Sequence, residues 1–468
     1  FFTDTTRGSM YTHNVLATDN FADNNAAYGF NALSAITTGD NNTAIGKGAG
    51  AALNTGTNNT LIGAFAGDVL ETGGNNVALG YEALSTNIDG DQNVAIGNYA
   101  LQDFEADADG HGQNTAIGYL SMAECSTGTA NTALGSHTIS SGILTGDHNT
   151  AIGYQAGQKM TSGNSNILIG SFTGDNINTG TFNVAVGYNA LSAIDSGARN
   201  VAVGYQALKN QNVGGIAYNT AVGHNTGAEI TTGVYNTMLG SLAGDGLTLG
   251  QHNAALGYNA LSATNAGSKS VAIGSGALSI QQPEFTVGGA SYAASGDATI
   301  THTANTNIVV GQVVTSSAAG IPSGATVLSV TDDTHFELSA NTTSSQSGQT
   351  LTFTGGVDGN NTAVGYLAGN AITTGTLNTL VGSLAGDALT TGSSNVAIGY
   401  EALTTEDTTG SSVAIGYRAL RVQNTGSTSY NVAVGTLAGS ALTTGTENTL
   451  IGGLAGDALT IGKHNVAI

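Results

Sequence analysis

The chain has 468 residues, of which 31 are acidic and 9 are basic, so its formal net charge at neutral pH is −22. So acidic a surface repels nucleic acids and anionic membranes, and neither is expected as a partner. Glycine contributes 70 residues but proline only 2, which excludes collagen and polyproline helices. No apolar stretch approaches the roughly 20 residues of a membrane span, so membrane insertion is not expected either.

A short motif organises nearly the whole chain. The pentapeptide Asn-Thr-Ala-Ile-Gly at residues 42–46 is one of 21 related copies, whose closing glycines run from Gly29 to Gly452. Of the 20 intervals between closing glycines, 15 are 17 residues long and the others are 18, 19, 19, 21 and 91 residues. A fixed period of this length predicts a solenoid built of stacked coils. The motif begins again before Ile468, so we expect the repeat to continue beyond the chain end.

Positions within a coil are numbered here from the closing glycine, which is position 0. Position −3 is nearly always Thr or Val, position −2 is mostly Ala, and position −1 is Ile, Val or Leu in all copies except Tyr28. This alternation predicts a short strand with two unlike faces, and we expect the aliphatic face to point into the coil. A second glycine at position +10 recurs in 17 of the 21 copies and predicts a tight turn. The predicted fold is therefore an all-β, flattened β-solenoid of about 21 coils.

Two coil types alternate irregularly along the chain. In one type a Leu such as Leu84 stands at position +4, whereas in the other this position is a glycine such as Gly67 and an aliphatic residue such as Leu70 appears at position +7. We interpret this exchange as the same apolar volume supplied from either position, as a close-packed interior requires.

The repeat is interrupted once, by a segment that contains both prolines, Pro283 and Pro322, and several short β-like stretches. About 75 residues of this kind predict a small β-sandwich or barrel. The coils resume in phase, so the insert is expected to leave and re-enter the solenoid at one turn. The predicted organisation is an irregular N-terminal segment (1–24), β-solenoid repeats (25–282), an inserted β domain (283–357) and further β-solenoid repeats (358–468).

The most regular polar feature is position −4, which is Asn in 19 of 21 copies, with Ser270 and Ser412 as the exceptions. The column could be a ligand-binding stripe or a structural ladder in which each amide bonds to its equivalent in the next coil. We favour the ladder, because the column runs the full length and Ser replaces Asn twice. Representative members are Asn42, Asn59, Asn76, Asn93, Asn114, Asn200 and Asn395.

Positions −2 and 0 together form a strip that has neither bulk nor charge. Such a strip either lies between chains that approach closely in a parallel homotrimer, or lies inside a flat coil where two layers meet. We favour the first interpretation, because a single solenoid with so few large residues would have a thin core. Representative members are Ala44, Gly46, Ala95, Gly97, Ala202, Gly204, Ala397 and Gly399.

Two further rows have a structural and a functional interpretation. Tyrosines at position +1 could stack on sugars, but such rows more often cover a corner of the coil, with the hydroxyl in water. Aspartates at position +5 could bind calcium, yet they recur too sparsely for a calcium-binding solenoid and are interpreted as turn residues. The tyrosines are Tyr81, Tyr119, Tyr154, Tyr188, Tyr205, Tyr258, Tyr366, Tyr400 and Tyr417, and the aspartates are Asp68, Asp175, Asp245, Asp387 and Asp457.

The sequence gives little support for catalysis. Cys125 is the single cysteine, and the nine histidines are scattered along the chain. We find no metal-binding cluster, no phosphate-binding loop and no nucleophile in a recognisable setting. We therefore predict that the protein is not an enzyme and that it uses no cofactor and no metal ion.

The repeat wording Asn-Thr-Ala-Ile-Gly-Tyr-x-Ala-Leu, with Thr-Thr-Gly turns between copies, resembles repeats of phage tail fibres and other virion fibres. Its variants at residues 270–274 and 412–416, which begin with Ser, resemble the head repeats of trimeric autotransporter adhesins. In the insert, residues 320–327 and 336–339 are similar to small β modules of phage structural proteins, which favours a phage.

The resemblance covers residues 25–282 and 358–468. It implies a trimeric, extracellular fibre on a virion or cell surface that holds a recognition tip at a distance and contacts a host glycan or protein receptor. The leading functional hypothesis is therefore a viral tail-fibre or virion-fibre shaft. The alternative is a bacterial surface adhesin or extracellular filament subunit.

Overall fold

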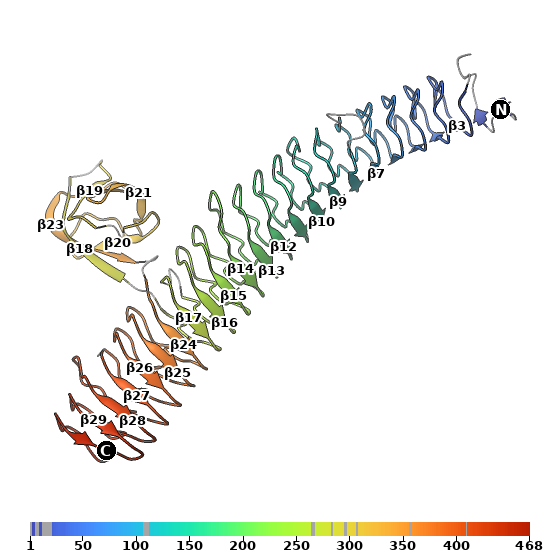
Figure 1. Cartoon of the computed structure of the whole chain (residues 1–468). Coiled ribbons are helices and arrows are strands. Elements are labelled where there is room, and N and C mark those ends of the chain that lie inside the picture. Colours follow the sequence, from blue (N-terminus) through green and yellow to red (C-terminus); the bar gives the residue numbers. More distant parts are fainter. Residues whose placement is uncertain are drawn as a thin grey trace. The chain divides into compact units, whose positions relative to one another are not determined.

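The protein is all-β in a computed structural model that describes residues 2–4, 9–11, 21–105, 112–263, 267–281, 284–293, 297–305, 308–354, 358–408 and 410–468. No helix occurs within these ranges. The chain divides into two compact units, Phe1–Ala217 and Tyr218–Ile468. Each unit is built of the coils of a parallel β-solenoid, as the sequence predicts, and the second also carries an antiparallel insert (Figure 1).

In the first unit the coil strands run from β3 to β13, one strand per coil. Each strand pairs in parallel with the next and in register, so that Thr43 lies opposite Thr60 and Ala44 opposite Leu61. The strands are β1 (Phe2–Asp4), β2 (Ser9–Tyr11), β3 (Ala26–Tyr28), β4 (Thr43–Ile45), β5 (Thr60–Ile62), β6 (Val77–Leu79), β7 (Val94–Ile96), β8 (Thr115–Ile117), β9 (Thr132–Leu134), β10 (Thr150–Ile152), β11 (Ile167–Ile169), β12 (Val184–Val186) and β13 (Val201–Val203).

The N-terminal segment, expected to be irregular, holds two of these strands. β1 and β2 pair antiparallel, and β2 pairs in parallel with β3, with Met10 opposite Ala26. The remaining residues of this segment up to residue 20 lie outside the described ranges.

In the second unit the coil strands are interrupted by the insert and then continue. β17 pairs in parallel with β24 across the 91-residue interval, with Val271 opposite Thr362, so the coils resume in phase as predicted. The coil strands are β14 (Thr220–Val222), β15 (Thr237–Leu239), β16 (Ala254–Leu256), β17 (Val271–Ile273), β24 (Thr362–Val364), β25 (Thr379–Val381), β26 (Val396–Ile398), β27 (Val413–Ile415), β28 (Val432–Val434), β29 (Thr449–Ile451) and β30 (Val466–Ala467).

The two faces of each coil strand are oriented opposite to our expectation. The residue at position −2 is buried, whereas its neighbours at positions −3 and −1 are only half-buried or exposed, as Ala44 and Ile45 illustrate. The prediction that the aliphatic face points into the coil is therefore wrong. The interior is already filled from positions +3, +4 and +7, as Ala83, Leu84 and Leu70 illustrate. What space remains suits a methyl group rather than two branched side chains.

The aliphatic side chains that alternate between positions +4 and +7 are buried, as expected. The order of the two coil types follows a rule that we did not identify from the sequence. Glycine-type coils come in adjacent pairs, and the second coil of each pair has a large residue at position −2. Leu61 is one such residue. A Cβ atom added at Gly50 would lie 2.8 Å from its Cδ1 atom, and one added at Gly67 would lie 3.0 Å from its Cδ2 atom. Two glycines therefore make room for one leucine, and volume is conserved across two coils.

The closing glycines stack directly on one another from coil to coil. Their φ angles lie between +128° and +146°, a region that residues with a Cβ atom rarely adopt. A Cβ atom added at Gly63 would lie 2.2 Å from the carbonyl oxygen of Gly80 in the next coil. The column of glycines is therefore required by close contact between backbones within one chain.

The insert is an antiparallel six-stranded sheet in the order β20-β23-β18-β19-β22-β21. A bridge between Val313 and Thr326 joins the two ends of this order, so the sheet closes on itself around Phe336 and Phe353. Its first and last strands pair, with Glu284 opposite Thr354. The predicted boundary at residues 282 and 283 lies outside the described residues. The strands are β18 (Glu284–Tyr292), β19 (Thr299–Thr301), β20 (Val313–Ser316), β21 (Val327–Asp332), β22 (His335–Leu338) and β23 (Gln346–Thr354).

Candidate functional site

The asparagines at position −4 form a buried ladder inside the coils. The Asn59 Oδ1 atom accepts hydrogen bonds from the backbone N–H of Asn76 at 3.0 Å and from its Nδ2 atom at 3.2 Å. The Asn59 Nδ2 atom donates to the carbonyl oxygen of Gly73 at 2.9 Å. Each amide thus satisfies a strand N–H and a turn carbonyl that would otherwise be buried without partners.

The bond from backbone N–H to Oδ1 recurs at every ladder position singled out from the sequence. In both units the backbone N–H of one asparagine donates to the Oδ1 atom of the asparagine one coil earlier, as in Asn200 to Asn183 at 3.1 Å and Asn395 to Asn378 at 2.9 Å. These side chains are almost completely buried, so a ligand at the surface does not reach them. The buried members include Asn42, Asn59, Asn76, Asn93, Asn114, Asn200 and Asn395.

Where serine replaces asparagine, a glutamine eleven residues later supplies the amide. The Gln281 Nε2 atom donates to the Ser270 Oγ atom at 2.9 Å, and the Gln423 Nε2 atom donates to the Ser412 Oγ atom at 2.8 Å. Both glutamines stand at position +7 and are fully buried. Gln211 at the same position donates to the Oδ1 atom of Asn200 at 3.1 Å, so such a glutamine is not confined to serine coils. At the two serines it supplies the amide that the shorter side chain lacks. We missed this pairing because the partners belong to different columns of the repeat.

The strip of small residues lies where our second interpretation placed it, within single coils. Every alanine singled out for this strip is fully buried in its own coil, and the glycine column is covered by the backbone of the neighbouring coil, as at Gly46 and Gly63. The strip is therefore an internal packing surface of the described coils. The four alanines are Ala44, Ala95, Ala202 and Ala397.

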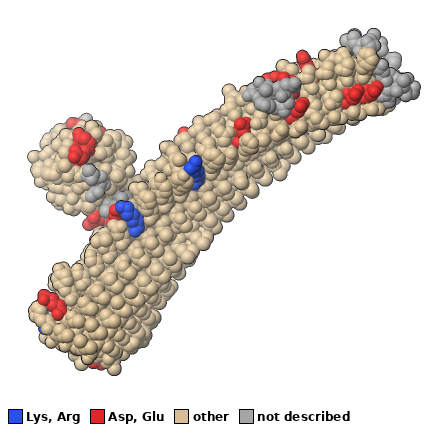
Figure 2. Space-filling model, viewed as in Figure 1, with Lys and Arg blue, Asp and Glu red and all other residues tan. Residues whose placement is uncertain are grey.

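The outer face of the strands carries the aliphatic side chains of position −1. We call this column the aliphatic row, and several of its members are more than two-fifths exposed. They are Ile45 (42%), Leu79 (43%), Leu134 (42%), Leu239 (47%), Leu256 (43%) and Ile451 (41%). Charged side chains are sparse on the face of the molecule that is in view in Figure 2. The coils therefore present an ordered apolar column to their surroundings.

A second apolar column follows the closing glycines of the first unit, and we call it the ring ladder. Each coil from Gly63 to Gly204 contributes one aromatic ring, at position +1 or +2, and neighbouring ring centroids lie 5.4 to 6.3 Å apart. Most pairs meet edge to face, the preferred geometry of aromatic pairs. The members are Phe65, Tyr81, Tyr99, Tyr119, His137, Tyr154, Phe172, Tyr188 and Tyr205.

The corresponding column of the second unit mixes tyrosines with leucines. Tyr400 and Tyr417 stack with their centroids 5.7 Å apart, and the guanidinium of Arg418 lies over both rings. A hydrogen bond from Tyr400 and a 2.7 Å ion pair with Arg418 hold the pKa of the Glu401 carboxyl below its usual range. Tyr258 and Tyr366 are each more than half exposed.

Of the aspartates at position +5, Asp457 is exposed and the other four are half-buried. Burial raises the pKa of Asp68, Asp175, Asp245 and Asp387, and one carboxylate oxygen of each is buried without a hydrogen-bond partner. These aspartates are several coils apart and so cannot share one ion. Within the described residues, no three His, Cys, Asp or Glu side chains gather in a way that would hold a metal ion.

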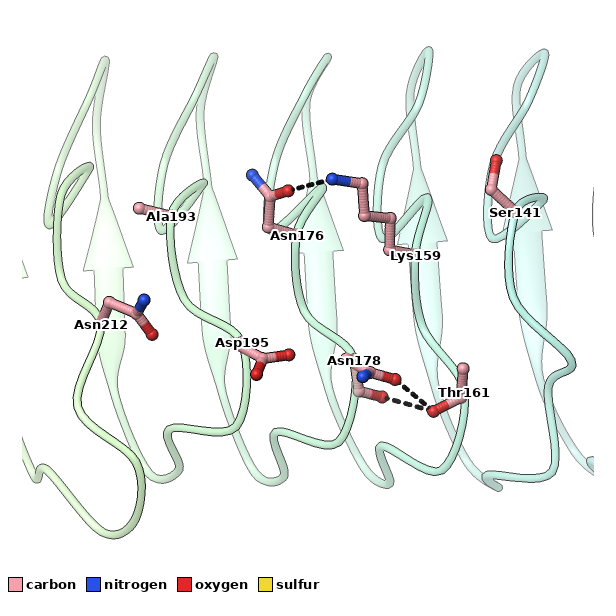
Figure 3. Close-up of a pocket in the computed structure, with 8 residues that line it drawn as sticks. All are labelled: Ser141, Lys159, Thr161, Asn176, Asn178, Ala193, Asp195 and Asn212. Carbon is pink, nitrogen blue, oxygen red and sulfur yellow. Dashed lines mark hydrogen bonds between the residues drawn. The ribbon is translucent and has the colours of Figure 1, made fainter.

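A shallow groove of about 470 Å³ crosses the side of the first unit between positions +6 and +8 (Figure 3). Its polar side chains bond to one another, because the Lys159 Nζ atom donates to the Asn176 Oδ1 atom at 2.6 Å and Thr161 donates to the side chain and carbonyl of Asn178. The groove is open polar surface rather than an enclosed site. It is lined by Ser141, Lys159, Thr161, Asn176, Asn178, Ala193, Asp195 and Asn212.

Cys125 is fully buried, and burial raises the pKa of its thiol to about 12. The thiol is therefore protonated at neutral pH, whereas a reactive cysteine needs the thiolate. No helix with the length and hydropathy of a membrane span occurs in the part of the chain that the structure describes.

The chain was compared with protein-family models, with curated proteins and with solved structures, and none of the three comparisons found a match.

Proposed function

We propose that this chain forms part of the shaft of an extracellular fibre, in which three copies pack side by side and in register. The observation that supports this most directly is the aliphatic row. Isolated exposed hydrophobic residues are normal on protein surfaces, but an ordered column that recurs coil after coil is typical of an interaction surface.

The size of the outer strand face supports self-association. Strands of neighbouring coils are about 4.8 Å apart and three strand residues span about 10 Å, so eleven coils present roughly 500 Å² of mostly apolar face in each unit. A patch of this size is comparable with the largest apolar patch of a typical monomeric protein, and such patches often mark interaction sites. Covering it removes apolar area from water and stabilises the assembly.

A second copy of the same chain fits this face better than an unrelated partner. Its aliphatic row repeats with the same coil spacing, so contacts made at one coil can recur at the next along the whole stack. A partner without this spacing would match over only a few coils. Three copies, each with one outer strand face towards a common axis, would cover all three faces at once.

A virion rather than a bacterial surface is favoured by the resemblance of the insert to β modules of phage structural proteins. The proposal is therefore a tail-fibre or virion-fibre shaft that holds a recognition tip away from its attachment point. It requires no catalytic chemistry and no cofactor.

Multi-angle light scattering on the full chain tests the assembly. We expect a particle of three times the chain mass of 46.3 kDa. Replacing Ile96 and Ile117 of the aliphatic row by Glu should dissociate it, because the interface would bury two unpaired charges per chain. The matched control replaces the exposed Gln92 and Gln113 of the same coils by Glu and should leave the mass unchanged.

Two results would contradict the proposal. A native chain that stays monomeric at micromolar concentration would leave the aliphatic row without a partner of its own kind. A trimer that survives the Ile96→Glu and Ile117→Glu substitutions would place the interface elsewhere.

A further inference from the structure

The ring ladder of the first unit has a feature that packing alone does not explain. From Gly63 to Gly204, every coil without a ring at position +1 has one at position +2, as in Tyr99, His137 and Phe172. At the same position several coils of the second unit have leucine, as in Leu242, Leu384 and Leu437, and these leucines are half-buried in glycine-type coils like that of Phe172. Leucine is therefore sufficient to cover this corner of a coil. The rings supply flat aromatic surface in addition.

We infer that the ring ladder binds an extended, neutral polysaccharide along the first unit. Sugar rings present apolar C–H faces that stack on aromatic rings, and hydroxyl edges that form hydrogen bonds. The tyrosines Tyr81, Tyr119, Tyr154, Tyr188 and Tyr205 are between 38% and 48% exposed, so their rings are accessible to such a ligand. This inference concerns the side of the coils and does not depend on the fibre proposal.

Polar side chains beside the rings could form hydrogen bonds with the hydroxyl groups of a sugar. In most coils of the ladder, whichever of positions +1 and +2 lacks a ring carries an amide or a hydroxyl group. Ring and hydrogen-bonding group therefore alternate along the column, which is how sites for polar organic ligands combine orientation with apolar contact. These side chains are Asn98, Ser136, Gln155, Ser171, Asn189 and Gln206.

Charge and spacing define the ligand further. The net charge of −22 disfavours anionic polymers, so a neutral polysaccharide fits better than an acidic one or a nucleic acid. Most successive rings are nearly perpendicular and cannot both present a face to one ligand. A polymer would therefore stack on alternate rings, two coils or about 10 Å apart, which is close to the length of two hexose units in an extended chain. A polymer can therefore contact several rings at once, and its contacts add as in other multivalent binding.

Affinity electrophoresis in native gels tests the inference with the full chain. The probes are a soluble β-1,4-glucan, an α-mannan and a dextran, each cast into the gel, with alginate as the anionic comparison. We expect at least one of the neutral polymers to retard the chain and alginate not to do so. Replacing Tyr99, His137 and Phe172 by Leu should weaken the retardation at least about tenfold, because three stacking contacts are lost.

Leucine already occupies position +2 in glycine-type coils of the second unit and, as Leu120, in a first-unit coil with Met122 at position +4, so the coils should remain folded. Circular dichroism and light scattering on the triple variant check this. As a control, Tyr258→Leu and Tyr366→Leu remove two exposed rings outside the ladder and should leave the retardation unchanged.

Three outcomes would overturn the inference. The first is no retardation by any neutral polymer, and the second is retardation that persists in the folded triple variant. The third is a triple variant with a changed oligomeric mass, which would assign the rings to contacts between chains instead.

Discussion

The coils and the insert use different means to stabilise a β structure in one chain. The insert has a local core in which the ring centroids of Phe336 and Phe353 lie 5.5 Å apart. Its strands are antiparallel and up to nine residues long. The coils have three-residue strands, small interior residues and a continuous ladder of buried amides. Large apolar side chains therefore dominate the insert. Backbone contact and repeated hydrogen bonds dominate the coils, and each coil depends on its neighbours.

The largest expected difference in stability is between replacing a glycine in close contact with neighbouring backbone and replacing one that has no close neighbour. Gly63→Ala should destabilise the coils by more than about 5 kcal/mol, because its φ angle is +137° and its Cβ atom would lie 2.2 Å from the carbonyl oxygen of Gly80. In the insert, Gly288 has no atom within 4 Å of an added Cβ and lies outside the left-handed region. Gly288→Ala should therefore change stability little. Chemical denaturation of both variants measures the difference, and equal effects would contradict it.

The next effect tests whether the insert unfolds independently. Phe336→Ala removes a fully buried ring and should destabilise the insert by about 3–5 kcal/mol. Calorimetry should show one transition moving to lower temperature while the transition of the coils stays in place. A shift of both transitions together would mean that insert and coils form one cooperative unit.

A smaller effect tests the compensation found at the two serines. Asn59→Ser should destabilise the coils by about 2–3 kcal/mol, since the backbone N–H of Asn76 and the carbonyl of Gly73 lose their partner. Adding Leu70→Gln places a glutamine eleven residues after the serine, as Gln281 follows Ser270, and also removes the buried leucine of this glycine-type coil. The double variant should be more stable than the sum of the single effects predicts. Strict additivity in a double-mutant cycle would argue against compensation.

The smallest effect is a difference in pH dependence. Burial raises the pKa of Asp68, Asp175, Asp245 and Asp387 above the ordinary value of 3.8, so the folded coils hold these protons more tightly than the unfolded chain does. Their contribution should stabilise the coils as pH falls through the folded pKa values towards 3.8.

The insert should respond in the opposite direction. Hydrogen bonds from Thr299 lower the pKa of Asp297, and those from Thr334 and His335 lower the pKa of Asp332. The stability that these carboxylates contribute is present above pH 3.8 and is lost as pH falls below it. Calorimetry at pH 7, 5 and 3 should therefore show the two transitions moving apart. Asp332→Asn should reduce the shift of the insert, and an unchanged shift would contradict this assignment.

Much of the coil architecture was predictable from the sequence, because a fixed period exposes it directly. The strand position, the turn glycines, the apolar exchange between Leu84-type and Leu70-type positions, and the in-phase return after the insert all follow from residue spacing. Residue spacing did not predict which face of each strand points into the coil. A three-residue alternation defines two faces, but only the volume already filled by the rest of the coil decides which one lies inside.

The outer columns were hidden for a related reason. The ring ladder alternates between positions +1 and +2, so a column-by-column comparison of repeats finds only its tyrosines at +1 and misses Tyr99, His137 and Phe172. Likewise, Gln281 supports Ser270 from another column. Features shared between two positions or two coils become visible only when the coils are stacked.

The pairing of Glu284 with Thr354 has a consequence for the order in which the chain folds. If the insert were unstructured when β17 meets β24, closing a 91-residue connection instead of a 17-residue one would cost about 1.5 kcal/mol more in chain entropy. A folded insert holds its own ends together, as a hairpin does, and removes most of this cost. Coil growth past Val271 should thus be fastest once the insert has formed, so that the largest interruption of the repeat acts as a short turn.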